Sequence, residues 1–314
     1  MSRISHFVLK YISSTFEHSK SLTMNWKKPW FQFSILLLLA FVWGSSFILM
    51  KIGLKSFSSE QAAGIRMLLA SVVLLPYSIK NLKLLKRKDL KSLLIAGFIG
   101  SFIPAFLFTE AQTQIDSALA GMLNSLTPIF TLVVGMLFHK TKFKWLQVAG
   151  LVIGLIGVLG LITSGEDLSF QNINSYALLI VLATIFYGIN INEIKARLSH
   201  LTGVQITSLA FFFTGPAALI YLLTTDFEPV FASQGWAIHF LALAALGIIG
   251  TALAMLLMNS LIRHISAVYA SSVTYIIPIF AIFWGVIDGE KITSLHVICM
   301  TCILLGVYLI NKKK

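Results

Sequence analysis

Long apolar runs separated by short polar breaks constrain the fold of this 314-residue chain more than any other feature. A helix that crosses the hydrocarbon layer of a membrane needs about 20 apolar residues. Ten runs reach or approach that length, and they cover residues 31–50, 61–79, 92–110, 117–138, 145–163, 175–192, 204–224, 236–259, 266–287 and 292–310. The sequence therefore predicts an all-α polytopic membrane protein with ten transmembrane helices.

The composition supports the same class. Hydrophobic residues make up 57% of the chain and charged residues only 11%, whereas charged residues make up about 25% of an ordinary soluble protein. A soluble domain of this size cannot hide so much apolar surface, because a large part of its periphery faces water. The composition excludes a soluble enzyme, a disordered chain and a secreted scaffold held by disulfides.

The basic residues are distributed unevenly between the two sides that ten spans define. The side that holds the N-terminus receives 20 Lys and Arg residues and the other side three, while Arg66 lies inside a span. Basic residues accumulate on the cytoplasmic side of a membrane. We therefore expect a multi-pass protein of the inner (cell) membrane with both termini in the cytoplasm. One miscounted span would invert every later loop, so the asymmetry independently supports ten spans.

The net charge of +12 also bears on binding partners. Because these cations lie in loops on one membrane face and are not interleaved with aromatic residues, we predict no nucleic-acid partner. The expected partners are a small-molecule substrate and the lipid bilayer, and a homodimer is compatible with the sequence.

Residues 1–30 are expected to form a cytoplasmic N-terminal tail. Residues 1–23 lack the continuous apolar region of a cleaved signal peptide. Two interpretations stay open: a mobile basic tail, or translation that begins at Met24, just before Lys27 and Lys28.

The chain contains an internal repeat of five spans, predicted at residues 31–163 and 175–310. An offset of 144 residues places Trp43-Gly44 on Tyr187-Gly188, and an offset of 150 places Pro128-Ile129-Phe130 on Pro278-Ile279-Phe280. The second offset also places Gly97 and Gly100 on Gly247 and Gly250. Because five is odd, the two copies have opposite topology in the membrane. Inverted repeats are typical of secondary transporters, whose substrate site lies between the halves near the midplane.

Two prolines interrupt equivalent spans close to the midplane. Pro128 and Pro278 lie about eleven and twelve residues into the fourth and ninth spans, or roughly 16–18 Å deep. A proline inside a helix frees the carbonyl four residues earlier, here those of Asn124 and Thr274. Two interpretations remain. The prolines form structural kinks whose freed carbonyls accept hydrogen bonds from neighbouring hydroxyls, or Pro128 and Pro278 shape the helices around a central cavity.

Aromatic and polar residues gather at the same depth in the equivalent spans. We predict that they line a substrate cavity, and the candidates are Trp43, Ser46, Asn124, Tyr187, Asn190, Ser272 and Tyr275. Core packing is the alternative for the aromatic members of this set.

Arg66 is the most costly residue in the chain because it lies inside the second span. Partial snorkelling toward the outer surface is one interpretation. The other is a functional charge that faces protein or a cavity, with Glu110 as its predicted partner and Lys51 in the same vestibule. The Arg66–Glu110 pair would then serve as an outer gate, a contact to a charged substrate, or a coupling site.

The chain shows no motif of an enzyme or an ATPase. A P-loop lysine, an H-E-x-x-H helix and a serine elbow are all missing. Cys299 and Cys302, the only cysteines, have no accompanying metal ligands and are expected to pack in the last span. We therefore predict no enzyme, no catalytic residues, no cofactor and no metal site.

Several short stretches together carry a family resemblance. They are Trp43-Gly44-Ser45-Ser46-Phe47 with Lys51, Arg66 with Leu68-Leu69-Ala70, Pro128-Ile129-Phe130, Gly150 with Gly157-Val158, and Pro278-Ile279-Phe280 through Glu290. In order and spacing they resemble the drug/metabolite transporter superfamily, in particular its ten-helix EamA-type members. Where that family usually closes the fourth or ninth span with a glutamate, the second copy has Glu290 and the first has Lys140.

The resemblance implies an inner-membrane carrier, often an exporter, for small metabolites such as amino acids or drugs. Combined with the repeat, it predicts a secondary transporter that exports a small metabolite or drug-like solute by alternating access without ATP. A membrane-embedded binding or scaffold protein, or a channel, remains the alternative.

Overall fold

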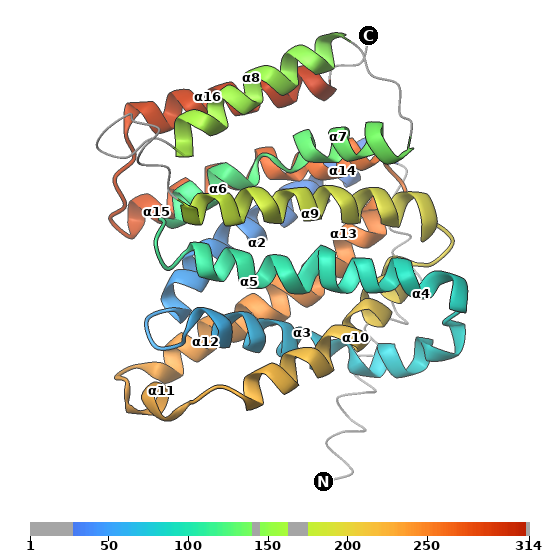
Figure 1. Cartoon of the computed structure of the whole chain (residues 1–314), viewed down its shortest axis with the longest axis vertical. Coiled ribbons are helices and arrows are strands. Elements are labelled where there is room, and N and C mark those ends of the chain that lie inside the picture. The colour runs from blue at the N-terminus through green and yellow to red at the C-terminus, as the bar shows by residue number, and fades with distance from the viewer. Residues whose placement is uncertain (1–27, 140–144, 163–174, 312–314) are drawn as a thin grey trace.

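The computed structural model describes residues 28–139, 145–162 and 175–311. Within these ranges every regular element is a helix, and the long helices lie side by side in one bundle (Figure 1). The expected N-terminal tail up to residue 27, including Met24, lies outside the described residues, as does Lys140.

The first repeat contributes five spans, three of which are built from more than one element. They are α2 (Pro29–Gly53); α3 (Ser59–Asn81) with η2 (Leu82–Leu84); α4 (Arg87–Leu94), η3 (Ile95–Phe102) and α5 (Ile103–Ala111); α6 (Ser117–Asn124) and α7 (Thr127–His139); and α8 (Trp145–Ile162).

The second repeat follows the same order. Its spans are α9 (Ser175–Arg197); α10 (Gly203–Leu223); α12 (Trp236–Gly247), η5 (Ile248–Leu253) and α13 (Ala254–Ile262); α14 (Ala267–Ser271), η6 (Ser272–Tyr275) and α15 (Ile277–Ile287); and α16 (Ser294–Asn311). A short helix, α11 (Glu228–Ala232), precedes α12.

Ten apolar helical segments account for the predicted spans. Eight of those described are long and apolar enough to cross a membrane, and α8 and α16 contain two shorter apolar segments. Each of these two helices has 18 residues and is therefore about 27 Å long, close to the ~30 Å hydrocarbon layer. The prediction of an all-α, two-repeat membrane protein is confirmed.

Equivalent capping boxes start the second helix of each repeat. The Ser58 hydroxyl accepts from the Gln61 N–H at 3.2 Å, and the Gln61 side chain accepts from the Ser58 N–H at 3.1 Å. Thr202 and Gln205 repeat both bonds at 3.1 Å and 2.8 Å. Such boxes satisfy two orphan donors of the helix N-terminus, so local sequence sets where α3 and α10 begin.

The two repeats are interlocked rather than placed side by side. Gly44 of α2 lies against α15, where a Cβ would come within 2.9 Å of the Ile277 carbonyl oxygen. Gly188 of α9 lies against α7, where a Cβ would come within 2.9 Å of the Thr131 nitrogen. The first helix of each copy therefore packs on the interrupted span of the other copy.

Helices α8 and α16 form a separate pair along one edge of the bundle, at the opposite edge from α10 (Figure 1). Gly150 and Gly306 let the two backbones meet, because a Cβ on Gly150 would collide with the Gly306 carbonyl oxygen. Cys299 packs against Gly160 in the same interface. Small residues allow this close approach in lipid.

Candidate functional site

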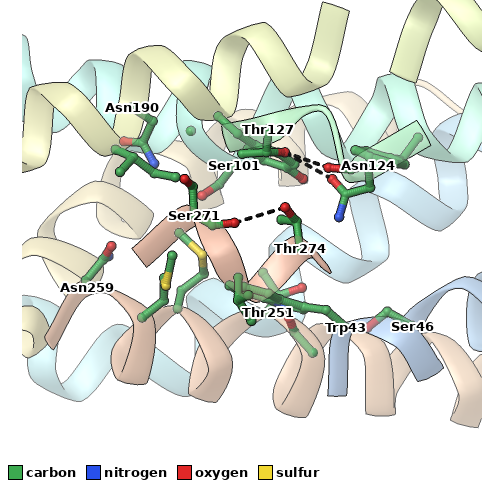
Figure 2. A pocket seen from close by; sticks show the side chains of 18 of the residues that line it. Trp43, Ser46, Ser101, Asn124, Thr127, Asn190, Thr251, Asn259, Ser271 and Thr274 are labelled. Carbon is green, nitrogen blue, oxygen red and sulfur yellow. Dashed lines mark hydrogen bonds between the residues drawn. The ribbon is translucent and has the colours of Figure 1, made fainter. Parts of the chain in front are cut away.

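A cavity of about 100 Å³ lies between the two repeats, walled by the first, third, fourth, sixth, eighth and ninth spans and by Arg66 of the second. Five of the predicted residues line it, namely Trp43, Ser46, Asn124, Tyr187 and Asn190. Figure 2 shows Trp43, Ser46, Asn124 and Asn190 around this space. The structure therefore gathers residues from both copies around one chamber.

Ser272 and Tyr275 are not among the lining residues, and their neighbours Ser271 and Thr274 take their place. Ser271 ends α14 and Thr274 lies in η6, a 3₁₀ segment in which residues three apart lie on the same face. This turn places Ser271 and Thr274 on the cavity face, where the Thr274 hydroxyl donates to the Ser271 carbonyl at 2.9 Å (Figure 2). The Ser272 hydroxyl instead donates to the Tyr269 carbonyl at 2.6 Å.

Pro128 and Pro278 lie in the first turns of α7 and α15, directly after the breaks in the fourth and ninth spans. The freed carbonyl of Asn124 accepts from the Thr127 hydroxyl at 2.9 Å. The freed carbonyl of Thr274 accepts from the Ser125 hydroxyl of the other copy, also at 2.9 Å. Neighbouring hydroxyls thus satisfy both breaks, and the same breaks line the cavity.

The third and eighth spans each contain a π-helical segment at equivalent positions, η3 and η5. The Ser101 hydroxyl reaches the Ala96 carbonyl at 3.5 Å, and the Thr251 hydroxyl reaches the Leu246 carbonyl at 3.0 Å. Both acceptors lie five residues earlier, which is the spacing of a π-helix. Such segments are frequent at functional sites because they redirect side chains.

Glycines in the two π segments make room for polar cavity residues. A Cβ on Gly250 would come within 2.8 Å of the Ser46 hydroxyl, and one on Gly100 would collide with the Asn190 amide. Ser46 and Asn190 are themselves related by the 144-residue offset. The Trp43 indole N–H donates to the Gly250 carbonyl at 2.9 Å, which fixes the ring at the cavity wall.

Arg66 does not pair with Glu110, and this expectation is corrected. Its Nε donates to the Thr251 hydroxyl at 2.7 Å, and it lines the cavity. Glu110 instead accepts from the Ser59 hydroxyl at 2.6 Å. Ser59 and Glu110 lie at the start of α3 and the end of α5, whereas Arg66 is two turns, about 10 Å, deeper along α3.

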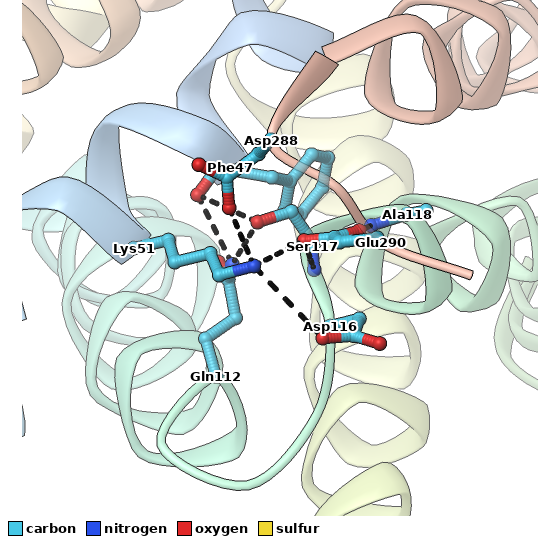
Figure 3. Close-up of polar contacts among 8 residues, drawn as sticks. All are labelled: Phe47, Lys51, Gln112, Asp116, Ser117, Ala118, Asp288 and Glu290. Atoms are coloured by element: carbon cyan, nitrogen blue, oxygen red, sulfur yellow. Dashed lines mark hydrogen bonds and ion pairs between the residues drawn. The ribbon is translucent and has the colours of Figure 1, made fainter. Parts of the chain in front are cut away.

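A cluster of charges lies where the end of α2 meets the end of α15 and the start of α6 (Figure 3). Lys51 lies next to the lining residue Met50, and its Nζ is 2.8 Å from Glu290 Oε1 and 2.7 Å from Asp288 Oδ2. Asp116 Oδ1 is 3.9 Å from the same nitrogen. This cluster of Lys51, Asp116, Asp288 and Glu290, called here the Lys51 cluster, joins α2 of the first repeat to the end of α15 in the second.

Glu290 also caps α6 of the opposite repeat. Its carboxylate accepts from the backbone N–H groups of Ser117 at 3.0 Å and Ala118 at 2.9 Å. Its side chain is only 2% exposed, and Gly285 leaves room for it, because a Cβ there would collide with the carboxylate. A negative charge is favourable at a helix N-terminus.

The equivalent of Lys51 makes a different contact. Lys195 Nζ donates to the backbone carbonyls of Ile262 at 3.0 Å and Arg263 at 3.2 Å, where α13 ends. This agrees with the sequence, in which the position equivalent to Glu290 is Lys140. The two equivalent lysines are therefore held by different chemistry, carboxylates for Lys51 and backbone carbonyls for Lys195.

Sequence reasoning did not select Ser101 and Thr251, although the repeat contained the signal. They directly follow Gly100 and Gly250, which the 150-residue offset aligns, and both line the cavity. Asn259 also lines the cavity, and no sequence motif marked it.

These features define the class: a two-repeat helical membrane protein with a central chamber between inverted copies. The chain matches the EamA-like transporter family over residues 30–163 and 174–312. It belongs to this family and is a membrane transporter. Membership in a transporter family confirms both the resemblance and the prediction that the chain is not an enzyme.

Curated relatives span almost the whole chain. It is 28% identical over 287 residues to the uncharacterized inner membrane transporter YedA of Escherichia coli K12, covering 90% of this chain and 91% of the relative. An S-adenosylmethionine/S-adenosylhomocysteine transporter of Chlamydia trachomatis is 25% identical over 265 residues, covering 80% of each chain. A solved crystal structure with 16% identity superposes with a TM-score of 0.61, covering 88% of this chain and 96% of that one, which shows a shared fold.

Proposed function

We propose that this protein is a secondary transporter that exports a small polar metabolite across the inner membrane by alternating access. The observation that carries the proposal is the chamber between the inverted repeats, lined by equivalent residues from both copies. A substrate site at the interface of inverted repeats is the usual arrangement in secondary transporters.

The interlocked packing supports alternating access. Helix α2 of the first repeat packs on α15 of the second, and α9 of the second repeat packs on α7 of the first. Each of these two contacts therefore joins one helix from each repeat. A rocking motion of one unit against the other would separate the helices at one end and bring them together at the other.

The Lys51 cluster supports a gate at one end in this mechanism. Glu290 joins Lys51 to the N-terminus of α6, so these bonds must break for that end to open. The bonds of Lys195 to the end of α13 would serve the other end. Because different bonds would have to break at the two ends, the outward-open and inward-open states could differ in free energy.

The charge asymmetry supports the orientation of the proposal. With both termini in the cytoplasm, the Lys51 cluster would face outward and Lys195 inward. The relative named as an S-adenosylmethionine/S-adenosylhomocysteine transporter supports a small metabolite as cargo. Transport would draw on an ion gradient or on the concentration difference of the solute itself.

Metabolite pools of cells that lack or overproduce the protein, compared with those of their media, would identify candidate cargo. The purified protein in liposomes should then give saturable, selective uptake and counterflow of that solute. Fluxes near diffusive ion rates without counterflow would indicate a channel, and no flux over the whole set of candidates would favour a scaffold.

A matched pair of variants on α2 tests the chamber itself. Ser46→Leu places an apolar side chain against Gly250 and should reduce uptake at least tenfold. Ser34→Leu makes the same change on the exposed face of α2 and should leave uptake unchanged. Equal uptake by the two variants, both monodisperse in detergent, would contradict the proposed substrate path.

A further inference from the structure

Arg66 is the one charged side chain among the described residues that line the cavity. Its Nε donates to Thr251, and no carboxylate of the described part of the chain lies within ion-pair distance of it. A guanidinium inside a membrane-spanning segment without a counter-charge is costly. Its planar donors match a carboxylate or phosphate in a two-pronged contact.

The charge belongs to one half of the chamber only. The 144-residue offset places Arg66 on Ala210, and the packing agrees, because Gly247 contacts Arg66 as the equivalent Gly97 contacts Ala210. The second copy therefore supplies no matching cation, and the chamber has one electropositive end where α3 meets η5.

Two buried amide oxygens on residues that line the chamber lack hydrogen-bond partners in the described part of the chain. They are Oδ1 of Asn190 and Oδ1 of Asn259, on residues that are 4% and 2% exposed. The Asn259 amide nitrogen donates to the Thr207 hydroxyl at 2.9 Å, which leaves its oxygen as the free group. Buried acceptors in proteins are almost always paired, so these two oxygens call for a donor from water or from a solute.

We propose that the cavity binds a small solute with an oxyanion at one end and a hydrogen-bond donor at the other. Arg66 would hold the carboxylate or phosphate, and Asn190 and Asn259 would accept from an ammonium, amide or hydroxyl group. This inference rests on the proposed function, since it names the chemistry of the substrate in that site.

The walls and the volume are consistent with this chemistry. Trp43, Met255 and Met258 add apolar surface to the lining, which suits the carbon chain between the polar ends. A water occupies about 10–15 Å³ measured in this way, so a chamber of about 100 Å³ holds several waters or a compact solute.

Ligand-induced thermal stabilisation of the purified full-length protein tests the inference without requiring transport, because a ligand of the folded state raises its unfolding midpoint. Three probes share a four-carbon frame: 4-aminobutyrate, its neutral amide 4-aminobutanamide, and butyrate. We expect 4-aminobutyrate to bind at least tenfold more tightly than the amide, and more tightly than butyrate. A parallel titration with 2-aminoethyl phosphate separates a phosphate preference from a carboxylate preference. Equal stabilisation by the acid and the amide would overturn the inference.

Variants assign the two ends of the solute. Arg66→Gln keeps a donor for Thr251 but loses the charge, and it should weaken 4-aminobutyrate binding at least tenfold. Arg87→Gln removes an exposed arginine outside the lining and should bind as the native protein does. Asn259→Leu should erase the preference for 4-aminobutyrate over butyrate while butyrate still binds. Unchanged binding by Arg66→Gln would refute the oxyanion site. An unchanged preference in Asn259→Leu would refute the donor end of the site, and if Arg66→Gln does not fold, the comparison of acid and amide on the native protein still tests the oxyanion end.

The outcomes separate this inference from the proposed function. Stabilisation without flux in liposomes would keep the binding site and remove the carrier. Saturable flux of a neutral solute, with no stabilisation by any of the oxyanions, would keep the carrier and remove the oxyanion site.

Discussion

Glu290 forms two kinds of bond at once. Its carboxylate holds the Lys51 ammonium and accepts two backbone N–H groups of α6. Hydrogen bonds to a charged group contribute about 1.5–3 kcal/mol each when the partner would otherwise be left unpaired. A single side chain therefore ties the two repeats together at this end.

We expect Glu290→Gln to lower the free energy of unfolding by about 1–3 kcal/mol, because an amide keeps the shape but loses the charge. Asp288→Asn is the matched control, since Asp288 contacts the same lysine but its side chain is 32% exposed. For such a partly exposed pair we expect a loss below about 1 kcal/mol. Chemical denaturation in detergent measures the free energy of unfolding of both variants. Equal decreases in the two variants would contradict the role of Glu290 in joining the repeats.

Asp116 lies just before α6, at the edge of the same cluster. Partial burial raises the pKa of Asp116, and so do the charges of Glu290 and Asp288, while Lys51 and His296 oppose the rise. The folded protein therefore binds a proton at Asp116 more tightly than the unfolded chain does. The ionised carboxylate costs stability, and this cost grows as the pH rises from about 3.8 through the raised pKa.

Asp116→Asn should consequently raise the unfolding midpoint at neutral pH. The advantage should shrink as the pH falls through the raised pKa of Asp116 and vanish below about 3.8, the ordinary value. Midpoints of the native protein and the variant between pH 4 and 8 give the difference directly. An advantage that grows toward acid would show that the Lys51 contact outweighs burial.

At the scale of the helices, glycines decide which elements can touch. Gly44 and Gly188 occupy equivalent places where α2 crosses α15 and α9 crosses α7. The facing atoms are backbone atoms in both cases, joined at Gly44 by the Cβ of Phe280, which is fixed to its backbone. A backbone cannot move aside as the end of a side chain can, so an added methyl group forces the helices apart.

Gly44→Ala and Gly188→Ala should each destabilise the protein by about 1–3 kcal/mol, as overpacked sites do, and should slow transport. Gly154→Ala is the control, because its Cβ would meet only the side chain of Ile129, which can shift. Thermal midpoints in detergent rank the three variants. A Gly154→Ala variant as unstable as the other two would show that helix crossing is not the cause.

The π segments η3 and η5 change the direction in which side chains of the third and eighth spans point. Each adds one residue to a turn in an equivalent span, and each places a hydroxyl residue, Ser101 or Thr251, at the cavity. This shift is what brings Thr251 to the Nε of Arg66. A regular α-helical projection does not reproduce it, because it assumes 3.6 residues per turn throughout.

At the scale of the whole molecule, the expected topology places the two ends of the bundle on opposite sides of the membrane. In a background with both cysteines replaced by alanine, Lys55→Cys should react with an impermeant maleimide in intact cells. Lys83→Cys, at the end of the second span, should react only after the membrane is permeabilised. Labelling of both positions from the same side would contradict the ten-span arrangement.

Much of the fold follows from the sequence because its causes are local. Apolar runs of sufficient length must form helices in lipid, since each backbone polar group needs a partner within its own segment. The 150-residue offset between Pro128 and Pro278 located the equivalent breaks in the fourth and ninth spans. Five of the seven predicted cavity residues line the chamber for the same reason, since their depth follows from counting residues along a helix.

The contacts of Arg66, Glu110 and Lys51 were decided by the tertiary structure. Residue counting gives the approximate depth of a side chain, but the direction in which it points depends on how helices cross and on where a helix turns as π or 3₁₀. Those crossings are set by backbone approaches at Gly44, Gly188 and Gly247, between segments far apart in the chain. The sequence by itself determined the spans, their number and the repeat. Only the packing of one repeat against the other decided which charges meet at the Lys51 end and which one is left facing the chamber.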